Sequence, residues 1–207
     1  MRLGLLTDIH EHVGYLRLAL AELKEVGVDQ IVVLGDVFET GRQLDETCRL
    51  LAEAAAIGVW GNHDYGLCVD PTDESRQRYS PDALKFMGTL QPRIVQWGCH
   101  FSHVEPWLNP ERVEDLWYFE GLPDDQRKRD RIFASVPDEI MFGGHYHRWL
   151  LTRPDLLLSW AADRPIQLTD GRYFVVIGAL CEGNFATFDT ETRELTPRQV
   201  SDPSPTW

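Results

Sequence analysis

Polar residues that can bind metal ions stand in five short groups along the chain. The groups read TDIH, GD, GNHD, FSH and GGHYH, and they offer carboxylate and amide oxygens together with several imidazoles. The candidate ligands are Asp8, His10, Asp36, Asn62, His103, His145 and His147. Such a mixed set of oxygen and nitrogen donors suits two divalent transition metals better than calcium or a structural zinc ion.

The spacing inside two of these groups favours joint binding of one ion. Residues two apart on an extended chain point to the same side, so Asp8 and His10 can share an ion. His145 and His147 repeat that spacing. A glycine precedes the candidate ligand in GD, GNHD and GGHYH, and glycine lets the backbone turn sharply next to a ligand.

The elements needed to position these groups can also be predicted. Apolar, strand-like runs end at Asp8 and Asp36 and again in GNHD, and amphipathic patterns between them predict helices over residues 13–27 and 44–58. This alternation of strands and helices predicts a parallel sheet packed between helices. Ligands bind beyond the carboxyl ends of such strands, so we expect the groups to converge at one edge.

The second half of the chain is less regular. We expect a short helix over residues 82–88, a strand over 93–106 that leads to His103, and later antiparallel strands with a turn at 169–171. The charged and aromatic stretch over residues 106–131 is interpreted as a solvated face. The Pro-rich tail over residues 196–207 is expected to fray.

Composition limits the classes of function. The chain has 207 residues, 43% of them hydrophobic, which suits one domain spanning residues 1–207. Its formal net charge of -13 disfavours nonspecific nucleic-acid binding but permits a small anionic substrate, since bound cations reverse the field locally.

Four cysteines without C-x-x-C spacing are interpreted as buried, reduced thiols. The chain shows no signal-peptide pattern or membrane-spanning run, so we expect a cytoplasmic protein.

The motifs D-x-H, GD, GNHD, a later His and GGHxH, in this order, resemble those of the calcineurin-like metallophosphoesterases. In length and spacing the chain is similar to the small bacterial and archaeal phosphodiesterases of that family. The resemblance begins at Leu3 and covers nearly the whole chain. It departs from the family pattern after His103, where Val104 replaces the usual glycine, and at Glu11 and His12.

The resemblance implies an α/β fold, a four-layer α-β-β-α sandwich of two mixed sheets flanked by helices. It implies two divalent ions, Mn²⁺ or Fe²⁺ in the first place, with Zn²⁺, Ni²⁺ or Co²⁺ as alternatives. One ion is held by Asp8, His10 and His147, the other by Asn62, His103 and His145, and Asp36 bridges them. His63 is implied to lie beside the metals as the catalytic acid, with Asp64 orienting its ring.

The chemistry that follows is hydrolysis of a phosphate ester. A hydroxide bridging the two ions attacks phosphorus, and His63 protonates the departing alkoxide. The expected substrate is a small-molecule phosphodiester. A phosphomonoesterase or phosphoprotein phosphatase with the same site is the alternative, disfavoured because no arginine lies inside a motif. A non-enzymatic interaction module is less favoured still, since His63 and the ligands are all present.

Several residues keep two interpretations. His103 is preferred to His100 as the fourth ligand, and His100 is then a core histidine. Glu11 and His12 either tune substrate entry or are solvated, and Glu39 is interpreted as a loop carboxylate more readily than a rim residue. The seven tryptophans are interpreted mainly as packing residues, with a stacking wall from Trp107 or Trp117 as an alternative. An oligomer through the aromatic residues 117–119 is possible.

Overall fold

The computed structural model describes residues 1–201 and contains two mixed sheets. The six-stranded sheet has the order β3-β2-β1-β10-β11-β8, with strands β1 (Arg2–Leu6), β2 (Gln30–Leu34), β3 (Ile57–Val59), β8 (Ile166–Gln167), β10 (Asn184–Asp189) and β11 (Glu194–Gln199). Strands β1 to β3 are parallel, and the other three join antiparallel. The predicted parallel strand order at the start of the chain is therefore confirmed.

The five-stranded sheet has the order β4-β5-β6-β9-β7. Its strands are β4 (Ile94–Gln96), β5 (Cys99–Phe101), β6 (Ile140–Gly143), β7 (Leu150–Thr152) and β9 (Tyr173–Val176). Strands β5, β6 and β9 are parallel, and the two edge strands pair antiparallel. Both sheets are thus mixed, as the family resemblance implies.

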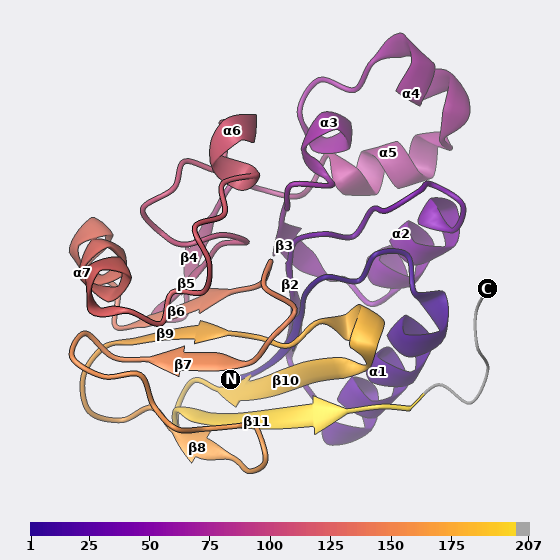
Figure 1. Ribbon diagram of the computed structural model, residues 1–207. Coiled ribbons are helices and arrows are strands. Elements are labelled where there is room, and N and C mark those ends of the chain that lie inside the picture. The colour runs from indigo at the N-terminus through magenta and orange to yellow at the C-terminus, as the bar shows by residue number, and fades with distance from the viewer. Residues whose placement is uncertain (202–207) are drawn as a thin grey trace.

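Helices cover the outer faces of the two sheets (Figure 1). Helices α1 (Val13–Val26) and α2 (Leu44–Glu53) lie on one side of the molecule, and α7 (Gln126–Ser135) lies on the opposite side. The remaining helical segments are α3 (Tyr65–Cys68), α4 (Asp73–Arg78), α5 (Pro81–Met87), α6 (Val113–Leu116) and the 3-10 turn η1 (Leu180–Glu182). The expected four layers of helix, sheet, sheet and helix are present.

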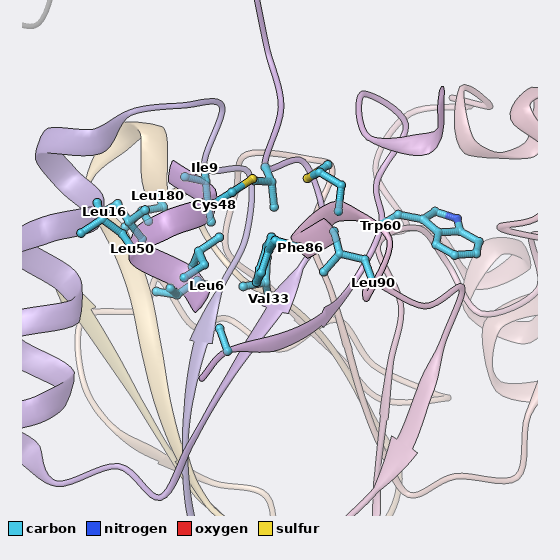
Figure 2. Close-up of a cluster of buried hydrophobic side chains, with 14 of the residues drawn as sticks. Leu6, Ile9, Leu16, Val33, Cys48, Leu50, Trp60, Phe86, Leu90 and Leu180 are labelled. Atoms are coloured by element: carbon cyan, nitrogen blue, oxygen red, sulfur yellow. The ribbon is translucent and has the colours of Figure 1, made fainter. Parts of the chain in front are cut away.

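Three hydrophobic clusters hold these layers together, and β2 shows how. Ile31 and Val33 face α1 and α2, in the cluster drawn in Figure 2, while Val32 and Leu34 pack between the sheets. A strand buried on both faces needs apolar residues at every position, which explains the continuous run QIVVL. A third cluster packs α7, through Ile132 and its neighbours, on the second sheet. Since the second sheet covers one face of the first, the prediction of helices on both faces of one parallel sheet is wrong.

Four local predictions need correction or qualification. The predicted helix over 44–58 ends at Glu53, because Ala55 adopts a left-handed φ of 50° and turns the chain into β3. The single strand predicted over 93–106 is a hairpin of β4 and β5, whose turn residues Trp97 and Gly98 both have positive φ.

The turn at residues 169–171 also differs from its prediction. It does not join paired strands, because β8 belongs to the first sheet and β9 to the second. The predicted fraying is wrong for residues 196–199, which pair with β10 across a hairpin. Residues 202–207 of that tail lie outside the described residues. Within residues 1–201 no helix has the length and apolar character needed to cross a bilayer.

Candidate metal centre

The candidate ligands sit on loops that leave the carboxyl ends of five parallel strands. Loops after β1, β2 and β3 carry Asp8, His10, Asp36 and Asn62, and loops after β5 and β6 carry His103, His145 and His147. The two sheets contribute to one edge, and the structure brings all seven side chains together there, as the sequence predicts. We propose that they act as metal ligands, on the geometry that follows.

The first cluster contains Asp8, His10 and His147. The Nε2 atoms of His10 and His147 lie 3.2 Å apart. Asp8 Oδ1 lies 4.0 Å from Nε2 of His10 and 3.5 Å from Nε2 of His147. These donor atoms are mutually within 4.8 Å, so one cation placed among them can reach all three.

The second cluster contains Asn62, His103 and His145. Asn62 Oδ1 lies 3.0 Å from His103 Nε2 and 3.0 Å from His145 Nδ1. His103 is fully buried, and its Nδ1–H donates to the Leu34 carbonyl over 2.7 Å. That hydrogen bond fixes the ring so that Nε2 faces the cluster, as in many metal-binding histidines. The replacement of the usual glycine by Val104 therefore does not displace His103.

Asp36 connects the two clusters. Its Oδ2 lies 3.7 Å from His10 Nε2 and 3.3 Å from His103 Nε2. Its Oδ1 accepts the backbone N–H of His63 over 3.0 Å, which fixes the orientation of the carboxylate. One oxygen atom is thus placed between both sets of donors, as a bridging ligand requires.

The donor set fits a pair of divalent cations on charge as well as geometry. Asp8 and Asp36 are buried, and buried carboxylates without a nearby positive charge are costly. Burial alone would raise the pKa of Asp36, but His103 and His10 hold it well below its usual range, so the carboxylate is ionised. The histidines compensate this charge when protonated, and cations would do so when bound.

The backbone at the ligand positions is strained. Asp8, His10, Asp36, His145 and His147 all have positive φ, between 45° and 72°. Such conformations cost about 1–3 kcal/mol each for non-glycine residues and collect at functional sites. The sequence offered no sign of them, because D-x-H and H-x-H look like ordinary extended spacing. The expectation that this spacing lets His145 and His147 share one ion is wrong, since their rings lie in different clusters.

At two of the three motif positions, the glycine has a different role from the predicted one. Gly61 and Gly144 do not need unusual φ values, but a Cβ at Gly61 would lie 2.1 Å from Asp36 Oδ1. A Cβ at Gly144 would lie 1.9 Å from Thr7 Oγ1 and 3.0 Å from Asp8 Oδ2. These glycines allow the loops to approach the ligands closely. Gly35, with φ 95°, is the position where the predicted sharp turn occurs.

Metal uptake is expected to release protons. The Asp36 carboxylate, against the effect of burial, raises the pKa of His103 to about 9, and hydrogen bonds to Asp8 and Cys181 raise the pKa of His147 to about 10. At about pH 8 both rings are protonated in the metal-free protein, so binding should displace about two protons and weaken as pH falls. Calorimetric titration with Mn²⁺ in buffers of different ionisation enthalpy measures this number. Identical heats in all buffers would contradict it.

Asp64 does not orient His63, and that expectation is wrong. Asp64 is fully buried, and its two oxygens accept backbone N–H groups at 2.9 Å, those of Val37, Phe38 and Gly61. Burial and the nearby Asp36 charge raise the pKa of Asp64 to about 7, which its amide hydrogen bonds oppose. Asp64 therefore ties the loop after β2 to the loop after β3.

Replacing Asp64 with alanine should destabilise the fold more than it disturbs the chemistry. It leaves three buried amides without an acceptor, at about 1–3 kcal/mol each, so we expect a loss of at least about 3 kcal/mol in the free energy of unfolding. Urea unfolding measures it, with His63→Ala as the matched control, since that side chain is 28% exposed. Equal stabilities of the two variants would contradict the role of Asp64 in joining the two loops.

Glu39 is the carboxylate that stands beside His63. It lies in a loop, as favoured from the sequence, but Oε2 also reaches the site, 3.4 Å from His63 Nδ1. The same atom is 2.8 Å from His10 Nδ1, although not aligned with that ring N–H. Glu39 therefore places a negative charge beside Nδ1 of both rings.

Glu11 explains how Glu39 is positioned. Its buried carboxylate accepts the backbone N–H groups of Glu39, Gly41 and Gln43, over 3.0, 2.6 and 2.8 Å. Glu11 is thus neither solvated nor a substrate contact. His12 lines the pocket, and burial followed by the proximity of His10 lowers its pKa.

Other predicted side chains lie away from the centre. His100 sits in β5, is buried, and pairs with Asp138 over 3.1 Å, which confirms its interpretation as a core histidine. Cys48, Cys68 and Cys99 are reduced thiols whose pKa is raised by burial. Cys181 differs, because it lines the pocket and its Sγ lies 3.7 Å from His147 Nδ1. Sequence analysis did not select it, since a lone cysteine gives no signal.

A cavity of about 500 Å³ opens above the two clusters. Its lining residues are His10, His12, Asp36, Glu39, Asn62, His63, Trp117, His145, His147 and Cys181. Trp117 forms a wall beside the candidate acid, with its ring centroid 5.2 Å from that of His63. A volume of this size accommodates a small organic phosphate.

Comparison with known sequences gives a family match over most of the chain. The family model described as calcineurin-like phosphoesterase superfamily domain matches residues 1–193 of this chain. An uncharacterized protein of Methanocaldococcus jannaschii is 26% identical in an alignment of 144 residues, and the match covers 58% of this chain and 59% of that protein. The matched part thus spans less than two thirds of this relative.

Solved structures share the fold. A metallophosphoesterase from Sphaerobacter thermophilus has a TM-score of 0.78 at 22% identity, covering 98% of this chain and 89% of that one. A structure described as a novel archaeal phosphodiesterase has a TM-score of 0.58 at 14% identity, covering 97% and 100%. The family match and the motifs in their four-layer fold lead to one conclusion: this chain belongs to the calcineurin-like phosphoesterase superfamily.

Proposed function

We propose that this protein hydrolyses phosphodiester bonds of small molecules, with two divalent cations, Mn²⁺ or Fe²⁺, as cofactors. One cation is held by Asp8, His10 and His147, the other by Asn62, His103 and His145, and Asp36 bridges them. The observation that carries the proposal is Asp36 Oδ2, which lies within 3.7 Å of His10 Nε2 and within 3.3 Å of His103 Nε2. We take residues 1–207 to act as one domain.

The cations would activate a water molecule and neutralise charge on the phosphate oxygens. The protein itself must deal with the leaving group, because an alkoxide departs poorly unless it is protonated. His63 is well placed to supply this proton, since it lines the cavity, is half-buried, and has Glu39 beside Nδ1. With Nδ1 directed to that carboxylate, Nε2 can deliver a proton to the departing oxygen.

The charge around the cavity favours a diester over a monoester. A phosphomonoester carries more negative charge, and sites that bind it often add arginine side chains. Within residues 1–201, neither Lys nor Arg lines this cavity, which instead presents the carboxylates of Asp36 and Glu39. A diester, with a single negative charge, needs less compensation.

The decisive experiment compares a chromogenic phosphodiester with the matching phosphomonoester. The protein is first loaded with Mn²⁺, Fe²⁺, Zn²⁺, Ni²⁺ or Co²⁺, and a chelated sample serves as the control. We expect metal-dependent turnover with a higher kcat/KM for the diester. A higher kcat/KM for the monoester would support the phosphatase alternative, and no hydrolysis of either ester with any ion would contradict enzymatic function.

A further inference from the structure

Two exposed aromatic side chains flank the centre. Trp117 is 55% exposed and lies beside His63, with ring centroids 5.2 Å apart. Phe119 is 65% exposed and lies on the side of His145, with centroids 6.5 Å apart. Large apolar side chains that stay exposed next to a functional cavity commonly mark a binding surface.

The segment that carries these rings, residues 117–119, is held in place by contacts of its middle residue. Tyr118, between them in sequence, packs its ring edge-on against Trp107 at 5.4 Å and donates from its hydroxyl to Glu120 over 3.0 Å. The Arg131 guanidinium covers the Trp107 ring at 3.5 Å and pairs with Glu120. Because Tyr118 is fixed by these two contacts, its neighbours Trp117 and Phe119 are presented with little ordering cost on binding.

The charges of the cavity limit what the rest of the ligand can be. Among the described residues 1–201, those lining the cavity include no Lys or Arg, so a second phosphate would meet no ammonium or guanidinium group. A ligand that fits therefore combines one phosphate with a flat, uncharged group. A planar ring stacked on an aromatic side chain gains about 1–3 kcal/mol without needing any specific hydrogen bond.

We propose that Trp117 and Phe119 form a stacking subsite for the base of a nucleotide that carries a single phosphate. The inference rests on the proposed function, because the candidate metal centre is what would hold that phosphate. It adds a substrate class to the reaction: a nucleoside phosphodiester rather than a sugar, lipid or polyphosphate ester.

The test is binding of AMP and of ribose 5-phosphate to the Mn²⁺-loaded protein, measured by calorimetry. The two ligands share a sugar phosphate and differ in the base. We expect AMP to bind at least about fivefold more tightly, the lower end of the stacking range. Trp117→Ala should remove most of this difference and leave ribose 5-phosphate unaffected, Trp117→Phe should retain it, and Phe119→Ala should reduce it. ADP should bind no more tightly than AMP.

Three outcomes would overturn the subsite. They are equal affinity of the unaltered protein for the two ligands, an equal loss for both in Trp117→Ala, and tighter binding of ADP than of AMP. A dimer in sedimentation that Trp117→Ala converts to a monomer would also overturn it, since residues 117–119 would then be a subunit interface. Diester hydrolysis is measured on the same samples. Hydrolysis without a preference for the base removes the subsite alone, and absence of hydrolysis removes the proposed function.

Discussion

Replacing His63 with alanine is expected to lower kcat for an alkyl phosphodiester by about 10²–10⁴-fold, the usual contribution of a positioned acid. The physical reason is the leaving group, because an alkoxide that departs without a proton develops a full negative charge. The ring lies at the cavity wall between Glu39 and Trp117. The proposed ligand sets do not include His63, although one of its nitrogens lies within 4.8 Å of donor atoms of His10 and Asp36. Metal content, measured by elemental analysis, should therefore stay at two ions per chain.

The dependence on the leaving group separates acid chemistry from a general defect. For a nitrophenyl diester the phenolate departs without help, so the loss in His63→Ala should shrink to roughly tenfold or less. Glu39→Gln is the matched control for orientation: it keeps the size of the side chain, and we expect it to lower kcat by about 10–100-fold. A loss in His63→Ala that is the same for alkyl and nitrophenyl esters would exclude the acid role.

Replacing Asp36 with asparagine is expected to abolish most activity by removing the charge between the two clusters. Oδ2 of Asp36 faces His10 and His103, so the neutral amide would leave both cations without their shared anion. Electrostatic stabilisation by cations amounts to several kcal/mol, which corresponds to about 10²–10⁴-fold in kcat/KM. The number of bound ions should fall below two, as measured by elemental analysis after dialysis.

The variant keeps the shape of the side chain, so folding is a minor concern. Asparagine can still accept the His63 N–H that Asp36 Oδ1 accepts now. The matched control is Asp70→Asn, which removes one negative charge from a side chain that is 97% exposed and should change neither metal content nor turnover. If Asp36→Asn retains two tightly bound ions and normal kcat/KM, Asp36 does not bridge the cations.

The convergence of the candidate ligands could be predicted from sequence because each stands within four residues of a strand end. A strand end fixes where Asp36 or His145 lies, and parallel strands bring such ends together. The partner of His63 could not be predicted in this way. Asp64 is its neighbour in sequence, but the turn directs the two side chains apart, and Glu39 approaches only because Glu11 binds its loop.

The strand pairing of the second half was also beyond local signals. The turn at residues 169–171 looks like any hairpin turn, and only the pairing of the two flanking strands in different sheets decides where the chain goes. The Trp97-Gly98 turn was missed because the apolar run continues across it. In both cases long-range packing, rather than local propensity, selects the structure.

Both donor clusters draw on both sheets: Asp8 and His10 meet His147 in one, and Asn62 meets His103 and His145 in the other. Neither sheet alone provides a complete set. Cations bound there would connect the two sheets at one end of the sandwich. Removing them with a chelator should therefore weaken the packing between the sheets at that end as well as stop turnover. The cofactors would then stabilise the fold as well as take part in the reaction.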